Sequence, residues 1–240
     1  MSFDADLEAL HHSDQRAVRT VDSLPDDQYG APSALPGWTC AHVIAHLALN
    51  AEGYTRSLEA LLDGHELAIY DSNEARDTAI ATLATADPSE LRDRFFAATH
   101  AMRDTFSDLR PEHRAASVNR LPSGPAWPVE GLVAARRLEV EVHHADLGLA
   151  YTAADWPADF TARLLDDITR NHAASGNTVP FAAYATDADR TWEVGADAPV
   201  VRGTAGELAW WLLGRSTGDG LAADAGELPS IGGWQRPIRA

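Results

Sequence analysis

Hydrophobic side chains recur every three or four positions over most of the first 150 residues, a spacing that predicts amphipathic helices. Long helices are expected over residues 3–23, 39–64, 88–109 and 129–148. Their ends coincide with suitable residues, because Thr39 favours the N-cap position, Asp87-Pro88 favours a helix start and Gly148 favours a helix end. A shorter helix is expected after Ser72, and the segment 115–128 is expected to be a loop or a short hairpin. Four long helices with short joints predict an up-and-down bundle.

The pattern changes after residue 150, where short strand-like runs replace some of the helical segments. A helix is expected from Ala158 to about His172, followed by strands over 179–184, 190–194 and 199–202, and then by a helix over 204–213. This order is typical of a small α+β unit. We therefore expect an α+β protein with two domains, a helical bundle at residues 1–150 and a small α+β domain at residues 151–240, with the boundary within 151–157.

The amino-acid composition argues against some classes of binding partner. The chain has 36 acidic and 19 basic side chains, a formal net charge of -17, which repels the phosphate backbone of nucleic acids and anionic membrane surfaces. No segment approaches the roughly 20 apolar residues that span a bilayer. The single cysteine, Cys40, excludes an intrachain disulfide, and the acidic N-terminus lacks an apolar signal core, so we expect a cytoplasmic protein without nucleic-acid or membrane partners.

Two of the expected helices carry candidate metal ligands. One contains His42 and His46, and the other contains Glu139 and His143, which lie four residues apart and so share a face. A lone helical histidine is usually not a ligand, and a Glu–His pair at this spacing can be a surface ion pair. However, the hydrophobic register turns His46, Glu139 and His143 inward, where an unpaired charge is costly. Two histidines and a glutamate with an open fourth position are typical of catalytic zinc.

The same helical register also predicts where the residues next to these candidate ligands lie. Glu141 and His144 fall off the inward face and are expected to face solvent or to be bystanders of the site, whereas Asp146 is expected to accept a hydrogen bond from a ligand or to cap the helix end. Cys40 lies at a helix N-terminus, where the dipole lowers a thiol pKa, but it stands almost two turns from His46, about 9 Å along the axis. We expect it to be a small buried side chain.

At these residues the sequence resembles the mycothiol-dependent maleylpyruvate isomerases, of the DinB-like metal-dependent bundle superfamily. Four segments, in order along the chain, carry the resemblance: Leu35-Pro-Gly-Trp-Thr39 with His42, His46 and Asn50; Tyr70 to Arg76; Arg137 to Gly148; and Gly214-Arg215-Ser-Thr-Gly218. The metal triad is shared across the superfamily, whereas the C-terminal Gly-Arg turn is typical of its two-domain branch.

The resemblance implies that His46, Glu139 and His143 hold zinc or another divalent metal, that Arg215 is the catalytic arginine of the C-terminal domain, and that mycothiol is the cofactor. It also implies conversion of maleylpyruvate to fumarylpyruvate, as in gentisate degradation. A thiolate suits this reaction, because it can add to the double bond, allow rotation and then leave. The substrate is a dianion, which a guanidinium can pair. Arg76, in the second matched segment, is a candidate for binding the thiol or the substrate, with a structural role as the alternative.

Three functions remain open from the sequence. The first is the isomerase, the second is a mycothiol S-transferase that conjugates another electrophile, and the third is a non-catalytic metal-binding regulator. An intact ligand set together with Arg215 argues against the regulator. The substrate pocket is not a linear motif, so the sequence does not separate the isomerase from the transferase, and it leaves the oligomeric state and the natural metal open. If the active site lies at the domain boundary, Arg215 is expected to reach towards the metal.

Overall fold

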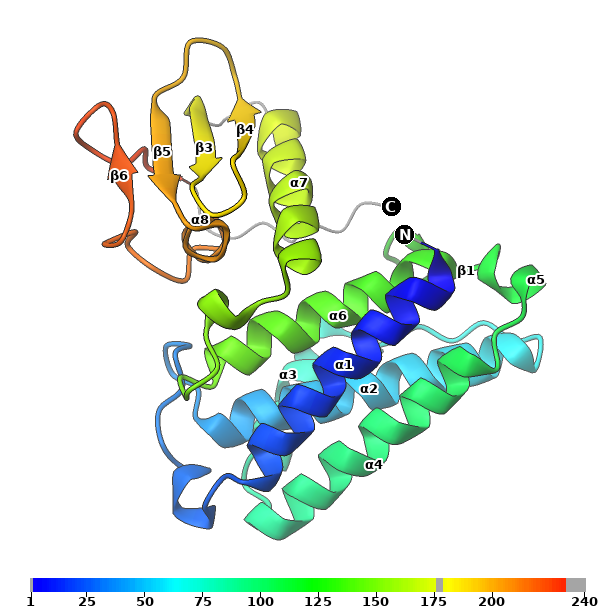
Figure 1. The fold of residues 1–240 in the computed structure, drawn as a ribbon. Helices are drawn as coiled ribbons and strands as arrows, with labels where there is room; N and C mark the ends of the chain where they lie inside the picture. Colours follow the sequence, from blue (N-terminus) through cyan, green and yellow to red (C-terminus); the bar gives the residue numbers. More distant parts are fainter. Residues whose placement is uncertain (1, 176–178, 232–240) are drawn as a thin grey trace. The chain divides into compact units, whose positions relative to one another are not determined.

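The computed structural model describes residues 2–175 and 179–231, and its contacts divide the chain into two compact units, the second of which begins at Ala150. The first unit is built mainly of helices, and the second combines helices with a mixed sheet (Figure 1). The expected α+β fold, with a helical N-terminal part, is confirmed.

Four long helices form the bundle of the first unit. They are α1 (Phe3–Asp22), α2 (Cys40–Leu62), α4 (Pro88–Ser107) and α6 (Val129–Asp146). Helix α1 packs along α6 and α2 packs along α4, with further contacts that close the bundle (Figure 1). Short elements fill the connections: η1 (Asp26–Gln28), α3 (Asn73–Leu83), α5 (Pro111–Arg114), and a hairpin of β1 (Ser117–Asn119) and β2 (Ala126–Pro128).

The helix ends follow from local chemistry. The Thr39 hydroxyl accepts a hydrogen bond from the backbone N–H of His42, and the Asp87 carboxylate accepts one from the N–H of Ser89. Each satisfies a donor that the first helical turn leaves without an intrahelical partner. Gly148 follows α6 with a φ of 71°, in the left-handed region that a side chain disfavours. These features fix where α2 and α4 begin and where α6 ends.

The expectation that Glu141 and His144 face solvent is wrong. Their exposed fractions are 0% and 1%. Glu141 accepts hydrogen bonds from the hydroxyl of Ser13 and the guanidinium of Arg16, and His144 Nε2 lies 2.8 Å from the Thr20 hydroxyl. The reason is that α6 packs against α2 on one face and α1 on another, so its second polar face is covered by polar partners on α1.

The second unit is a layer of two helices on one face of a sheet. Its elements are η2 (Ala153–Asp155), α7 (Ala158–Ser175), β3 (Phe181–Ala185), β4 (Arg190–Val194), β5 (Val200–Gly203), α8 (Ala205–Leu212) and β6 (Ala222–Ala223). The strand order is β4-β3-β5-β6, with β3 parallel to β5 and the other pairs antiparallel. Phe181 contacts the rings of His172 on α7 and Trp211 on α8, so both helices cover the same face. The two-residue strand β6 has no counterpart among the strands expected from the sequence.

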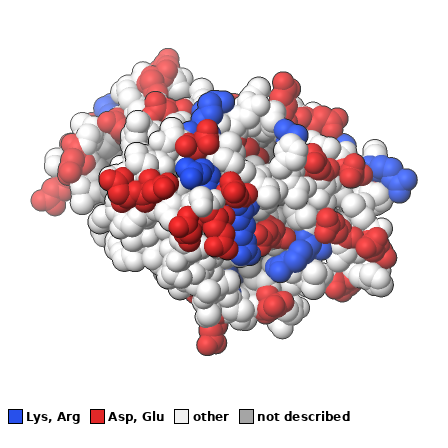
Figure 2. Space-filling model, turned by 90° about the horizontal axis from the view of Figure 1, so that it is seen from below, with Lys and Arg blue, Asp and Glu red and all other residues white. Residues whose placement is uncertain are grey.

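The surface agrees with the acidic composition. On the face shown in Figure 2, acidic side chains are widely spread, and basic side chains lie among them rather than in a separate patch. Among the described residues, no helix is both long and apolar enough to cross a membrane.

Candidate metal centre

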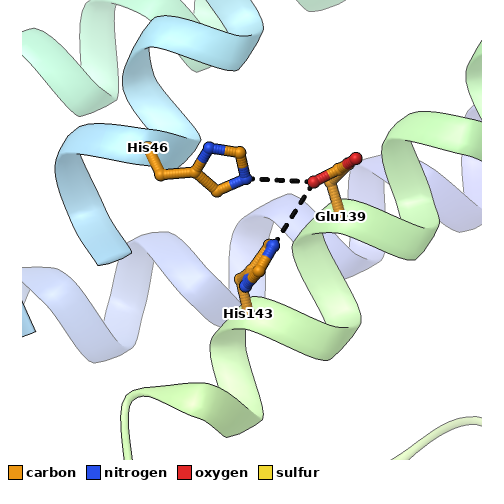
Figure 3. Close-up of side chains that lie close together, drawn as sticks. All are labelled: His46, Glu139 and His143. Carbon is orange, nitrogen blue, oxygen red and sulfur yellow. Dashed lines mark hydrogen bonds and ion pairs between the residues drawn. The ribbon is translucent and has the colours of Figure 1, made fainter. Parts of the chain in front are cut away.

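Three buried side chains from two helices meet inside the bundle. His46 comes from α2, and Glu139 and His143 come from successive turns of α6 (Figure 3). Nε2 of His46 lies 3.0 Å from Oε2 of Glu139, and Nε2 of His143 lies 3.3 Å from the same oxygen. One nitrogen or oxygen atom of each residue lies within 4.8 Å of the others. The structure therefore brings together the three residues that the helical spacing singles out.

Burial and nearby charged groups shift the pKa values of the two histidines in opposite directions. Burial of the ring disfavours its charged form and, together with the nearby His143, lowers the pKa of His46 to about 4. Burial alone would also lower the pKa of His143, but hydrogen bonds to Asp146 and Glu139 outweigh it and raise that pKa. Burial thus favours the neutral form of His46, whereas the two neighbouring carboxylates favour the charged form of His143.

Asp146 orients His143 by contacting the ring nitrogen that does not face Glu139. The Nδ1 atom of His143 lies 2.8 Å from Oδ2 of Asp146, whose carboxylate is fully buried and can only accept. This contact places the Nδ1 proton on the Asp146 side and turns Nε2 towards Glu139. A carboxylate behind a histidine is the usual support of a metal-ligating imidazole.

The dimensions and the donor types fit a divalent metal. Two ligand atoms that each lie 2.0–2.1 Å from a tetrahedral zinc are about 3.4 Å apart. The 3.0 and 3.3 Å separations at Glu139 are close to that value, so a small outward movement of the side chains would admit the ion. Two imidazoles and one carboxylate suit zinc, and three protein ligands leave a coordination position open.

The loop before α2 holds His46 in place. Gly37 has a φ of 79° and allows the tight turn that brings Trp38 back over α2, where its ring lies 5.9 Å from that of His46. The N–H of Ala34 donates to the carbonyl of Asp146, which fastens this loop to the end of α6. The start of α2 and the end of α6 are thereby joined beside the three candidate ligands.

A buried polar network one turn from the candidate ligands was not expected from the sequence. Arg136 is 0% exposed and donates to the carbonyl of Leu47 and to Oδ1 of Asn50, which in turn donates to the Tyr70 hydroxyl. The signal was present, because Arg136 precedes Glu139 by three residues and Asn50 follows His46 by four. The network ties α6, α2 and the segment before α3 together at the level of the metal centre.

Arg76, Arg215 and His42 are also candidates from the sequence, and none of them belongs to the cluster of three side chains. Arg76 lies on α3, pairs with Asp77 at 2.6 Å, and carries a charge that contributes to the low pKa of His46 after burial and His143. Arg215 belongs to the second unit and lies half-buried on the turn after α8, where its N–H donates to the carbonyl of Trp210. His42 folds back on Thr39 as part of the helix cap.

Cys40 is buried, as expected. Its exposed fraction is 1%, its thiol donates to the carbonyl of Leu147 at 3.5 Å, and burial raises its pKa despite its place at the helix start. A thiol in this state is a poor nucleophile.

Comparison with known proteins assigns both units to one family. Residues 10–148 match the model of the mycothiol maleylpyruvate isomerase N-terminal domain, and residues 155–233 match that of the MDMPI C-terminal domain. The fold is similar to a crystal structure of the mycothiol-dependent maleylpyruvate isomerase and to that of a mutant in which alanine replaces a histidine. Each likeness covers 98% of both chains, with a TM-score of 0.89 and 24% sequence identity, and so concerns the fold. No curated protein sequence matches the chain.

Proposed function

The chain belongs to the mycothiol maleylpyruvate isomerase family, and from this membership we propose that it is a mycothiol- and metal-dependent cis–trans isomerase that converts maleylpyruvate to fumarylpyruvate. The observation that carries the proposal is the convergence of two imidazole Nε2 atoms, from His46 and His143, on one carboxylate oxygen of Glu139. Both histidines and the carboxylate are buried, so a dissociable thiol and substrate would react away from bulk water.

The three ligands are proposed to hold a divalent metal, zinc by the preference of this donor set. When bound, the metal would favour the thiolate form of a thiol coordinated beside it. Asp146 would keep His143 in the tautomer that ligates through Nε2. Cys40 is buried with a raised pKa, which supports a thiol supplied by the cofactor rather than by the protein.

The substrate of this reaction carries two negative charges, and addition of a thiolate to it generates an enolate. We assign Arg215 to the pairing of this charge, because a planar guanidinium binds carboxylates and enolates through two parallel N–H groups. Arg76 is assigned to the binding of the thiol or of a substrate carboxylate. Its charge acts on His46, so it lies close enough to the metal centre to attract an anion.

The deciding experiment is an assay of the purified protein with maleylpyruvate, with and without mycothiol. Conversion to fumarylpyruvate that requires mycothiol and returns it unchanged would support the isomerase. Consumption of one mycothiol per substrate molecule would instead identify an S-transferase. If the metal is bound and neither reaction occurs with this substrate, the isomerase proposal is wrong.

A further inference from the structure

A pocket lies on the bundle, on helices that carry none of the proposed metal ligands. It is lined by α1 and α4, has a volume of about 410 Å³, and lies within the size range of small-molecule sites. The metal centre uses α2 and α6 instead. The pocket therefore takes no part in the reaction proposed above.

Two buried polar side chains in this pocket wall lack hydrogen-bond partners in the described part of the chain. Asp14 of α1 is 4% exposed and neither carboxylate oxygen has a partner, and Thr99 of α4 is 6% exposed with an unpartnered hydroxyl. The contrast with Thr105 on the same helix is informative, because that hydroxyl donates to the carbonyl of Ala101. Buried polar groups are rarely left unsatisfied, so these two point to a missing ligand.

Neighbouring charges do not satisfy Asp14. Arg136 is the cation with the largest effect on its pKa, but the NH1 group of Arg136 donates to Leu47 and Asn50, and its Nε and NH2 groups make no hydrogen bond to Asp14. Arg103 also attracts the carboxylate, whereas its NH1 group lies 3.3 Å from Nδ1 of His11. Burial outweighs both charges and raises the pKa of Asp14 to about 7. A cationic donor brought by a ligand would relieve this cost.

The rest of the pocket wall presents the opposite charge and an apolar surface. Arg19 of α1 and Arg103 of α4 supply guanidinium groups, which suit a carboxylate. Val18 and Phe96 supply the apolar wall. An acid, two guanidinium groups and an apolar wall in one pocket are complementary to an ammonium, a carboxylate and a hydrophobic side chain in one molecule.

We propose that the α1/α4 pocket binds a small zwitterion of the amino-acid type, with its ammonium group at Asp14 and Thr99, its carboxylate at Arg103 and Arg19, and an apolar side chain against Phe96 and Val18. The site is separate from the metal centre, and its occupancy satisfies the buried carboxylate and hydroxyl that residues 2–175 and 179–231 leave without hydrogen-bond partners.

The test compares three probes that differ by one charged group, measured by titration calorimetry on the full chain. L-phenylalanine carries both groups, phenethylamine lacks the carboxylate, and 3-phenylpropionate lacks the ammonium. L-phenylalanine is expected to bind at least about tenfold more tightly than either analogue, a difference of about 1.4 kcal/mol. L-leucine and L-valine are measured alongside it to sample smaller apolar side chains.

Variants then locate the site. Asp14→Asn is expected to weaken L-phenylalanine at least about tenfold and to leave 3-phenylpropionate unchanged, because only the ammonium loses its partner. Asp22→Asn makes the same change at an exposed position of α1 and is expected to alter neither affinity. Thr99→Ala provides a second variant in the wall, with a severalfold loss expected, should Asp14→Asn fail to fold.

Two results would overturn the proposal. One is the absence of saturable binding by any of the three amino acids up to about 10 mM, a concentration that detects Kd values in the millimolar range. The other is unchanged affinity for L-phenylalanine in folded Asp14→Asn or Thr99→Ala, which would place any binding elsewhere, the metal centre included.

Discussion

Asp146 stands one turn beyond His143 on α6, and its Oδ2 atom lies 2.8 Å from the Nδ1 atom of that histidine. The carboxylate is 0% exposed and the imidazole is 7% exposed, so the contact is made away from water, where a charge-assisted hydrogen bond is strong. The last turn of α6 therefore holds both a proposed ligand and the group that fixes its orientation.

Asp146→Asn tests this support. The amide oxygen can still accept the Nδ1 proton, but it carries no charge, and changes of this kind cost roughly 10–100-fold in metal affinity. We expect a weakening of zinc affinity on that scale in a competition titration with a chelator, with the helical circular dichroism retained. Asp93→Asn, at an exposed position of α4, is the matched control. Equal affinity in both variants would show that Asp146 does not support a ligand.

The metal content of the purified protein tests the ligand set itself. We expect about one divalent ion per chain, mainly zinc, from the donor set of His46, Glu139 and His143. His46→Ala and His143→Ala are each expected to reduce the occupancy at least about tenfold by elemental analysis, because two remaining ligands hold zinc poorly. His12→Ala removes an exposed histidine and is expected to keep the ion. A full complement of metal in the His46→Ala/His143→Ala double variant would refute the assignment.

Cys40→Ala tests whether the protein supplies the thiol. Since Cys40 is buried and burial raises its pKa, we expect turnover within about twofold of the wild-type value and no reaction of the native protein with a thiol reagent. Small changes of a buried side chain of this size cost about 1 kcal/mol, so the melting temperature is expected to fall by a few degrees. A loss of activity by orders of magnitude in the folded variant would make Cys40 a nucleophile.

Arg215→Ala tests the catalytic arginine. Loss of a donor that stabilises developing negative charge typically lowers kcat by about 10²–10³, and we expect an effect of this size with metal content and melting temperature nearly unchanged. Arg215→Lys is expected to restore activity only in part, since an ammonium cannot reproduce the planar fork. Arg202→Ala is a control in the same unit, where the guanidinium pairs with Asp224 at the surface. A similar loss in both variants would argue for a general structural effect.

The sequence predicts much of this structure where the signal is local. Thr39, Ser72 and Asp87 are N-caps, as their side-chain chemistry predicts, and the positions of His46, Glu139 and His143 follow from helical register. The hairpin at β1 and β2 and the three main strands of the second unit also lie near their expected positions.

The sequence could not predict features that depend on which helix faces are buried by other helices. Register places Glu141 and His144 on a second face of α6, and only the packing of α1 shows that this face is buried. The link from Arg136 through Asn50 to Tyr70 likewise joins three segments that are distant in sequence. In the sequence, Asp14 is an ordinary acidic residue on an amphipathic helix. Only the folded structure shows that its carboxylate is buried and lacks a hydrogen-bond partner among the described residues.

The buried carboxylate of Asp14 makes the stability of the protein depend on pH. Burial raises its pKa from 3.8 to about 7, against the lowering effect of the Arg136 charge. The charge of Glu141 adds to the increase, and that of Arg103 opposes it. Between these values the folded state holds a proton that the unfolded state has released, so the free energy of unfolding falls as pH rises from about 4 to about 7 and then levels off. A difference of about three pH units corresponds to about 4 kcal/mol as an upper order of magnitude.

Asp14→Asn is expected to abolish this dependence, because the amide is neutral in both states. Other groups titrate in the same range, so the informative quantity is the difference in unfolding free energy between variant and wild type, measured by urea denaturation without added ligand. That difference should shift in favour of the variant by a few kcal/mol between pH 4.5 and pH 7.5. Asp22→Asn, whose carboxylate is exposed, should show no such shift. A constant difference for Asp14→Asn across the range would mean that Asp14 ionises normally in the folded protein, with partners or water satisfying its charge.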